Sequence, residues 1–262
     1  MLKSIQHILI ANRGEIAVRI MKTCHLMGLR VTTLYSDADY NAPHVKLADR
    51  SFRIGTAPGK DSYLCIDKII DVALRAGVDA IHPGYGFLSE NPQFSAACDA
   101  AGLIFIGPRT ETIEQMGSKE QARKLAIDAG IAVVPGSDEV LQSDDEFLRA
   151  ADEIGYPVLL KASAGGGGKG MRIVFSSESL VEAVHSARRE AKSAFNNEAL
   201  LIEKYLENSR HIEVQIMGDN HGNVVHLYER ECSIQRRYQK IIEESPAPSL
   251  NPELKEKLTA AA

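Results

Sequence analysis

The first hundred residues alternate between short β-prone runs and helical stripes of apolar residues. Ile8 to Ala11 is strand-like, and the β-branched run 31–35 is a second strand candidate. Apolar residues recur at helical spacing within 16–24 and again within 66–74. Strands separated by helices of this length favour a parallel sheet with helices on both faces. We therefore expect a Rossmann-like α/β domain over residues 1–106.

The pattern changes after residue 106. Residues 107–131 contain a Gly-Pro pair and a capped helix, which predicts a helical linker. Residues 132–206 begin with a strand candidate at Val133 and continue with two helices and further strands, which indicates a small α+β domain. Residues 207–262 start with a cleanly alternating strand and an antiparallel partner. Because the chain stops before this sheet could bury a face, we expect a truncated sequence or pairing with another chain.

Composition narrows the class of protein. The net charge of −5 argues against a general nucleic-acid or membrane surface, so an anion site has to be built locally. The four cysteines show no C-x-x-C spacing, as expected for reduced thiols. Apolar runs are shorter than the ~18 residues of a membrane span, and the first strand begins too early for a signal peptide. These features predict a soluble, cytoplasmic protein with neither nucleic-acid nor membrane partners.

Four consecutive glycines, 165–168, lie between two predicted strands and are followed by Lys169 and Gly170. A hairpin turn needs only two residues, and glycine loses the most freedom on ordering. The compensation is a backbone that can close on a ligand and present N–H donors to oxyanions. Because Lys161 and Lys169 flank the loop, a polyphosphate is the natural ligand. The alternative interpretation is a flexible hairpin tip.

Several segments together resemble one known family. Residues 156–170 resemble the nucleotide-binding loop shared by carbamoyl-phosphate synthases and biotin carboxylases, two members of the ATP-grasp superfamily. Residues 11–17, 82–91 and 229–237 resemble biotin carboxylase in particular, and the match runs in order along the whole chain. The resemblance implies a Rossmann-like domain followed by an ATP-grasp fold. In that fold the small α+β domain is a lid, and the last region is an incomplete C-terminal subdomain.

The resemblance also implies roles for individual residues. Lys119, at the start of the linker helix, and Lys161 match the lysines that hold ATP phosphates, although Lys119 taken alone would better suit a solvated first turn. Lys161 fits physically too, because a lysine inside an apolar strand must find an anion. Gly167 and Gly168 match the loop that covers the triphosphate. The other positions that match nucleotide contacts of the family are Glu203, Lys204, Tyr205, Leu206, His211 and Gln235.

A cationic cluster near the end of the chain matches the bicarbonate site of the family. Lys240 corresponds to the lysine that binds bicarbonate, a role suited to a compact point charge. Arg230, Arg236 and Arg237 lie within the same eleven residues with few acids between them, which favours an anion pocket. Tyr238 departs from the family, where a histidine is common. A tyrosine there could donate a hydrogen bond to nucleotide but could not carry the charge.

The reaction implied by the resemblance uses ATP to activate bicarbonate as carboxyphosphate and then carboxylates biotin. Its cofactors are ATP, Mg²⁺ or Mn²⁺, bicarbonate, and biotin on another domain or chain. Its partners are a biotin carboxyl carrier domain and a carboxyltransferase subunit, and the full-length family member is expected to be a homo-oligomer. The metal ligands are expected beyond residue 262, so none is assigned in this chain, which we expect to be inactive alone.

Two alternatives stay open. One is a different ATP-grasp ligase, such as a carbamoyl-phosphate synthase half. The other is a non-catalytic ATP-binding or subunit-docking module. Acetyl-, propionyl- and methylcrotonyl-CoA carboxylases all fit the resemblance, because the acyl-CoA specificity belongs to a separate carboxyltransferase. Residues 82–86 are expected to position a loop near the cleft rather than to act in catalysis.

Overall fold

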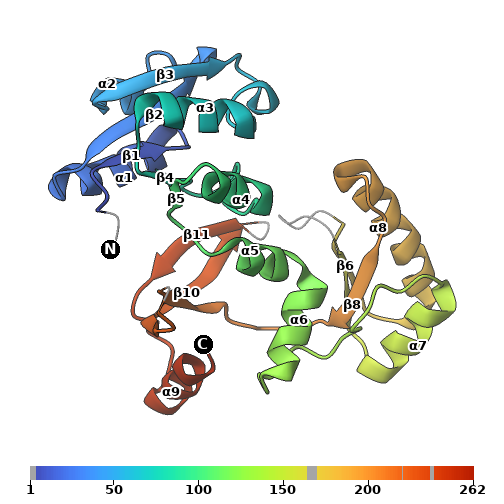
Figure 1. Cartoon of the computed structure of the whole chain (residues 1–262). Helices are drawn as coiled ribbons and strands as arrows, with labels where there is room; N and C mark the ends of the chain where they lie inside the picture. The colour runs from blue at the N-terminus through green and yellow to red at the C-terminus, as the bar shows by residue number, and fades with distance from the viewer. Residues whose placement is uncertain (1–3, 164–169, 220, 237–238) are drawn as a thin grey trace. The chain divides into compact units, whose positions relative to one another are not determined.

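The computed structural model describes residues 4–163, 170–219, 221–236 and 239–262, apart from the side chain of Lys119. The chain divides into two compact units, residues 1–117 and 118–262 (Figure 1). The boundary falls inside the segment that was predicted to be a linker. The finer predicted division of the second unit after residue 206 stays a prediction.

The first unit is built on a five-stranded parallel sheet of order β3-β2-β1-β4-β5. Its strands are β1 (His7–Ile10), β2 (Arg30–Ser36), β3 (Arg50–Gly55), β4 (Ala80–His82) and β5 (Ile104–Phe105). Its α-helices are α1 (Gly14–Leu26), α2 (Pro43–Leu47), α3 (Ile66–Ala76), α4 (Pro92–Ala100) and α5 (Thr110–Gly117). The predicted Rossmann-like architecture is therefore confirmed.

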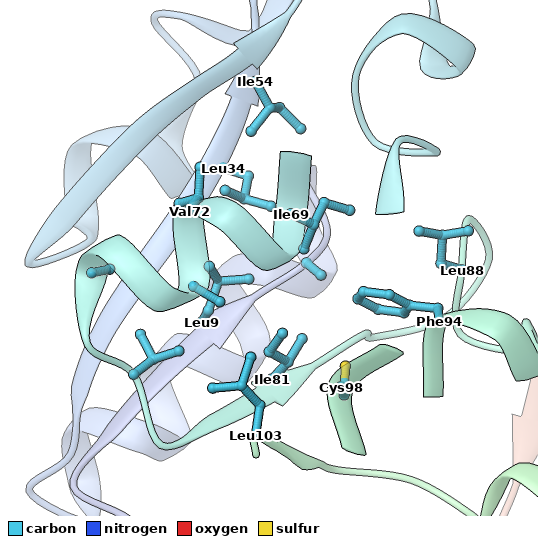
Figure 2. Close-up of a cluster of buried hydrophobic side chains, with 14 of the residues drawn as sticks. Leu9, Leu34, Ile54, Ile69, Val72, Ile81, Leu88, Phe94, Cys98 and Leu103 are labelled. Carbon is cyan, nitrogen blue, oxygen red and sulfur yellow. The ribbon is translucent and has the colours of Figure 1, made fainter. Parts of the chain in front are cut away.

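Both faces of this sheet are buried, which explains the continuous apolar runs of its central strands. Successive residues of β1 point to opposite faces. Leu9 belongs to one buried cluster with residues of α3 and α4, such as Ile69 and Phe94 (Figure 2). Ile8 and Ile10 belong to the cluster on the other face, which includes the apolar side of α1. The two clusters together enclose the sheet between layers of helices.

Hydrogen bonds within the protein link the segments that follow β1 and β4, at the crevice between the ends of these two strands. In doubly wound sheets this switch point is the usual ligand crevice. Here the side-chain amide of Asn12 donates to the carbonyls of Pro83, at 2.7 Å, and Tyr85, at 2.8 Å. Gly84 has φ +67°, and a Cβ there would lie 2.8 Å from the Asn12 amide nitrogen. The segment after β4 is thus a loop held by the β1–α1 turn, which fits the absence of a dinucleotide motif.

A partly buried carboxylate, Asp39, ties three segments of the first unit together. It accepts hydrogen bonds from Ser36 Oγ at 2.7 Å and Tyr63 Oη at 2.8 Å, and Arg13 lies 3.3 Å away. Burial raises the pKa of Asp39, but these hydrogen bonds and the Arg13 charge outweigh burial and leave the pKa below its ordinary value. The contribution of Asp39 to stability is therefore present at neutral pH and is lost as the pH falls through its lowered pKa.

We expect Asp39→Asn to lower the free energy of unfolding at pH 7 by about 1–2 kcal/mol, because charge-assisted hydrogen bonds are lost. The difference from the wild type should shrink below about pH 4, where Asp39 itself becomes protonated. Urea unfolding at a series of pH values measures this. The matched control is Asp37→Asn, which removes an exposed ion pair with Arg53 and should cost little. A difference that stays constant down to pH 2 would contradict the assignment.

The second unit contains two antiparallel sheets, of order β7-β6-β8 and β11-β10-β9. Its strands are β6 (Val158–Ala162), β7 (Arg172–Val174), β8 (Leu200–Lys204), β9 (Ile212–Gly218), β10 (Val224–Arg236) and β11 (Gln239–Glu244). Its α-helices are α6 (Lys119–Asp128), α7 (Asp144–Ile154), α8 (Leu180–Phe195) and α9 (Pro252–Ala261). Parallel and antiparallel sheets of this kind bear out the predicted fold class.

The strand predicted at Val133 is wrong. This segment forms only isolated bridges to β8, at Gly136 and at Leu141. Pro135 has no N–H to give to a ladder, which explains the interruption. Its carbonyl instead accepts from the Lys204 N–H at 2.7 Å, so the segment runs beside β8 without becoming a strand.

One face of the β7-β6-β8 sheet carries the core of the second unit. Phe147 from α7, Val184 from α8 and Leu160 from β6 are fully buried in one cluster. Helix α7 starts with a capping box formed by Ser143 and Glu146, which fixes where its apolar stripe begins. Because Leu160 points into this core, its neighbour Lys161 points to the opposite face of the sheet.

The β11-β10-β9 sheet is covered far less than the other two. Large apolar side chains such as Met217, Val225 and Ile241 are more than half exposed.

The four cysteines are free thiols. In the part of the chain that the structure describes, no helix is both long and apolar enough to cross a bilayer.

Candidate functional site

A cleft of about 820 Å³ lies in the second unit and is lined by residues of β6, β8, β10 and the segment between β8 and β9. A volume of this size suits a small-molecule ligand. Seven residues that the sequence predicted to contact nucleotide line it together, namely Lys161, Glu203, Lys204, Tyr205, Leu206, His211 and Gln235. They come from segments up to about seventy residues apart, so the fold brings them together.

Lys161 and Glu203 form an ion pair across β6 and β8. The side chains keep 29% and 20% of their exposure, so the pair lies at the cleft wall and still meets solvent. The anion that a lysine in an apolar strand requires is thus supplied by the protein. Phosphate entering the cleft would compete with the Glu203 carboxylate for the Lys161 ammonium.

Gly136 is needed beside this ion pair, and sequence reasoning missed it. A Cβ at this position would lie 2.7 Å from the Ile202 carbonyl oxygen and 2.8 Å from Glu203 Cγ. The Pro-Gly pair at 135–136 is the signal that could have revealed a close backbone approach.

The segment that follows β8 is fixed by its own contacts. The Lys204 ammonium donates to the carbonyls of Gly155 and Tyr156, at 3.0 and 2.8 Å. The Tyr205 N–H donates to the Pro157 carbonyl at 3.0 Å. The Lys204 side chain therefore anchors this segment to the turn before β6. Leu206 is about half exposed on the cleft wall.

His211 and Gln235 are neighbours across β9 and β10. The Gln235 side-chain amide donates to His211 Nδ1 at 2.9 Å and to the Cys232 carbonyl at 2.8 Å. The backbone N–H of His211 donates to Ser233 Oγ at 3.0 Å. Since Nδ1 accepts a hydrogen bond in this arrangement, the Nε2 atom of a neutral His211 carries the proton.

Lys240 does not line this cleft. It lies on β11 and binds Glu213 of β9, whose other partner is Arg230 of β10. Burial raises the pKa of Glu213, but hydrogen bonds from Lys240 and Arg230 outweigh burial and lower it overall. Hydrogen bonding to Glu213 raises the pKa of Lys240. The predicted cationic cluster therefore contains an acid that comes from a distant strand.

Glu213 is the residue of this cluster that sequence reasoning missed. It follows His211 by two positions, so the alternation of the strand places both on one face. Glu213, Cys232 and Glu243 also offer possible metal-ligand atoms within 4.8 Å of one another. The Glu213 carboxylate is already bound to two cations there, and a thiol is a poor ligand for Mg²⁺.

Four predicted contacts cannot be placed in the cleft from the described structure. Gly167, Gly168 and Tyr238 lie outside the described residues. Lys119 is the first residue of helix α6, and Ser118 is the N-cap, with its Oγ accepting from the Gln121 N–H at 3.3 Å. The side chain of Lys119 lies outside the described part of the structure. The roles of all the candidate site residues stay predictions.

Comparisons with known proteins divide the chain as the structure does. Residues 4–113 match the model of the biotin carboxylase N-terminal domain. Residues 118–262 match that of the ATP-binding domain of the carbamoyl-phosphate synthase L chain. The chain belongs to the biotin carboxylase family. As a member of that family it is related to ATP-dependent ligases.

Curated relatives match almost the whole chain. The mitochondrial methylcrotonoyl-CoA carboxylase subunit alpha of Dictyostelium discoideum is 53% identical over 261 residues, which are 100% of this chain and 37% of the relative. The biotin carboxylase of Halalkalibacterium halodurans is 53% identical over 96% of this chain and 56% of the relative. The chain thus spans roughly a third to three fifths of the length of the relatives it matches.

Solved structures agree in fold. The biotin carboxylase β,γ-ATP complex from Campylobacter jejuni has a TM-score of 0.94 and 48% identity, over 98% of this chain and 58% of that one. The biotin carboxylase domain dimer of Hydrogenobacter thermophilus 2-oxoglutarate carboxylase, in complex with MgADP, ADP and bicarbonate, has a TM-score of 0.93 and 48% identity, over 99% of this chain and 57% of that one. The predicted ATP-grasp architecture of this biotin carboxylase family member is therefore confirmed.

Proposed function

We propose that this chain provides the ATP- and bicarbonate-binding part of a biotin carboxylase. In the proposed reaction ATP phosphorylates bicarbonate, and the resulting carboxyphosphate carboxylates biotin on a carrier domain. The single observation that carries the proposal is the cleft that gathers seven predicted nucleotide contacts. Relatives that bear biotin carboxylase names support it. The proposed partners are the biotin carboxyl carrier domain, a carboxyltransferase subunit and further copies of the same protein.

The residues of the cleft would act by positioning and by neutralising charge, which is the main requirement of phosphoryl transfer. The Lys161 ammonium would exchange the Glu203 carboxylate for ATP phosphate. His211 Nε2–H would offer a further donor on the cleft wall, with the ring held in place by the Gln235 amide. Lys240 would hold bicarbonate. Mg²⁺ or Mn²⁺ would supply further charge neutralisation, but the cluster around Glu213, whose carboxylate already binds two cations, does not suit either ion.

The test is release of phosphate from ATP by the natural protein that carries residues 1–262. We expect hydrolysis that depends on bicarbonate and is stimulated by free biotin. Matched reactions that lack bicarbonate or biotin are the controls. Formation of carbamoyl phosphate from an ammonia donor would favour the carbamoyl-phosphate synthase alternative instead. Binding of ATP without turnover in the presence of both substrates would favour a non-catalytic module and contradict the proposal.

A further inference from the structure

One arginine of helix α6 binds the extended segment that runs beside β8. The Nη1 atom of Arg123 donates to the Val134 carbonyl at 2.6 Å, and its Nη2 atom donates to the Gly136 carbonyl at 3.4 Å. Its Nε atom donates to the Asp138 carboxylate at 3.1 Å. All three nitrogens of a single guanidinium thus bind residues 134–138, which we call the wall segment.

The wall segment is bonded to a different element along each of its two edges. Toward β8, the Pro135 carbonyl accepts from the Lys204 N–H at 2.7 Å, and the Ser137 N–H donates to the Ile202 carbonyl at 2.8 Å. The two carbonyls that Arg123 binds belong to the even-numbered residues of the segment, and they lie on the other edge. The guanidinium therefore supplies donors where a further strand would otherwise supply them.

The bonds to the two carbonyls suit an arginine in particular. The Arg123 side chain is 14% exposed, whereas that of Asp138 is 75% exposed. An ion pair with so exposed a partner contributes little to stability. Carbonyls shielded from water need donors, and the planar fork of a guanidinium can reach two of them at once. A lysine ammonium is a compact point charge and lacks this fork.

The wall segment forms part of the nucleotide cleft. Val134 lines the cleft together with Lys161 and Glu203. Gly136 forms a bridge to Glu203, and the space between them is too small for a Cβ. Movement of the wall segment away from β8 would therefore change the cleft beside the Lys161–Glu203 ion pair. Arg123 is not one of the described residues that line the cleft, so its effect on a ligand has to pass through the wall segment.

We propose that Arg123 is a positioning residue that holds the wall segment against β8 and so maintains the shape of the nucleotide cleft. The proposal rests on the proposed function in one respect, because the nucleotide as ligand belongs to that function. The hold on the wall segment is independent of it. Arg123 lies in the predicted linker, and the wall segment lies in the predicted lid, so the same contact joins these two regions.

Hydrogen exchange tests the hold directly, with mass spectrometry on the natural protein that carries residues 1–262. Arg123→Met should speed amide exchange in the wall segment and at Lys204 by at least about tenfold, the factor expected when one charge-assisted hydrogen bond is lost. Exchange in β1 of the first unit should stay unchanged. Arg123→Lys should show a smaller increase, because it keeps the charge without the planar fork. The controls are Lys124→Met, at an exposed position of the same helix, and Asp138→Asn, and both should match the wild type within about twofold.

Bicarbonate-dependent ATP hydrolysis tests the effect on the cleft. Arg123→Met should raise the KM for ATP roughly 3- to 10-fold, the range expected for a residue that acts on a site without contacting the ligand. The KM for bicarbonate should change by no more than about twofold, since Lys240 lies outside this cleft. Arg123→Lys should recover part of the loss, and Lys124→Met should leave both KM values unchanged.

Different results would overturn different parts of the proposal. Unchanged exchange in the wall segment of Arg123→Met, or faster exchange throughout the second unit, would overturn the hold. Faster exchange confined to the wall segment and Lys204, with an unchanged KM for ATP, would overturn the positioning role. An equal rise in both KM values would also overturn it, since this indicates general loss of structure. A wild-type protein without bicarbonate-dependent hydrolysis would refute the proposed function instead, and the exchange rates would still decide whether Arg123 holds the wall segment.

Discussion

Replacing Lys161 with methionine should weaken the binding of ATP by roughly 30- to 100-fold. Loss of one charged partner from a partly buried ion pair costs about 2–3 kcal/mol at the lower end of the measured range, and each 1.4 kcal/mol is tenfold. The variant also leaves the Glu203 carboxylate on the cleft wall without its cation, where it would repel the triphosphate. Methionine keeps the length and apolar character of the stem, so β6 should be preserved.

Calorimetric titration with ATP, ADP, AMP and adenosine measures this effect. The loss should be largest for ATP and nearly absent for adenosine, because Lys161 is expected to contact phosphate and not the base. Lys192→Met is the matched control, since Lys192 is an exposed lysine in the last turn of α8. An equal loss for adenosine would show that Lys161 maintains the shape of the cleft instead.

Phe147→Ala should lower the free energy of unfolding of the second unit by about 3–5 kcal/mol. The Phe147 ring is fully buried between α7, α8 and the β7-β6-β8 sheet, and the Arg188 guanidinium lies 5.5 Å from its centre. The substitution removes the apolar contacts of the ring and leaves a cavity that the packed helices can fill only in part. A loss of this size is a large fraction of the stability of a typical domain.

Urea unfolding followed by circular dichroism provides the measurement. Phe175→Ala removes the same atoms from a side chain that is 64% exposed, and it should change stability by less than about 0.5 kcal/mol. Similar effects of the two substitutions would contradict the assignment of Phe147 to the core.

The kinds of elements were largely predictable, but their order in space was not. Alternating strands and helices predicted a parallel sheet over the first hundred residues, and the sheet is there. Nothing in the alternation specifies the order β3-β2-β1-β4-β5, because strand order depends on how the helices pack across both faces. The strand predicted at Val133 was wrong. That prediction relied on the apolar residues of the segment and overlooked Pro135, which has no N–H to donate to a neighbouring strand.

The candidate site, too, was predictable from the sequence only in part. The sequence predicted Lys161 as an anion-binding residue, because an ammonium group on an apolar strand needs a negatively charged partner. It also placed His211 on the polar face of its strand, since side chains alternate along any strand. The resemblance added the remaining positions. Seven of these residues line one cleft, and their contacts with nucleotide stay predictions.

Local sequence patterns were sufficient to locate most strands and helices, because backbone geometry imposes the periodicity of each element within a few residues. The partners of the lysines were set by the folded chain alone. Glu203 lies 42 residues from Lys161, and Glu213 lies 27 residues from Lys240. Such pairs depend on the register between strands and on how the sheet twists, and no local pattern records either of them.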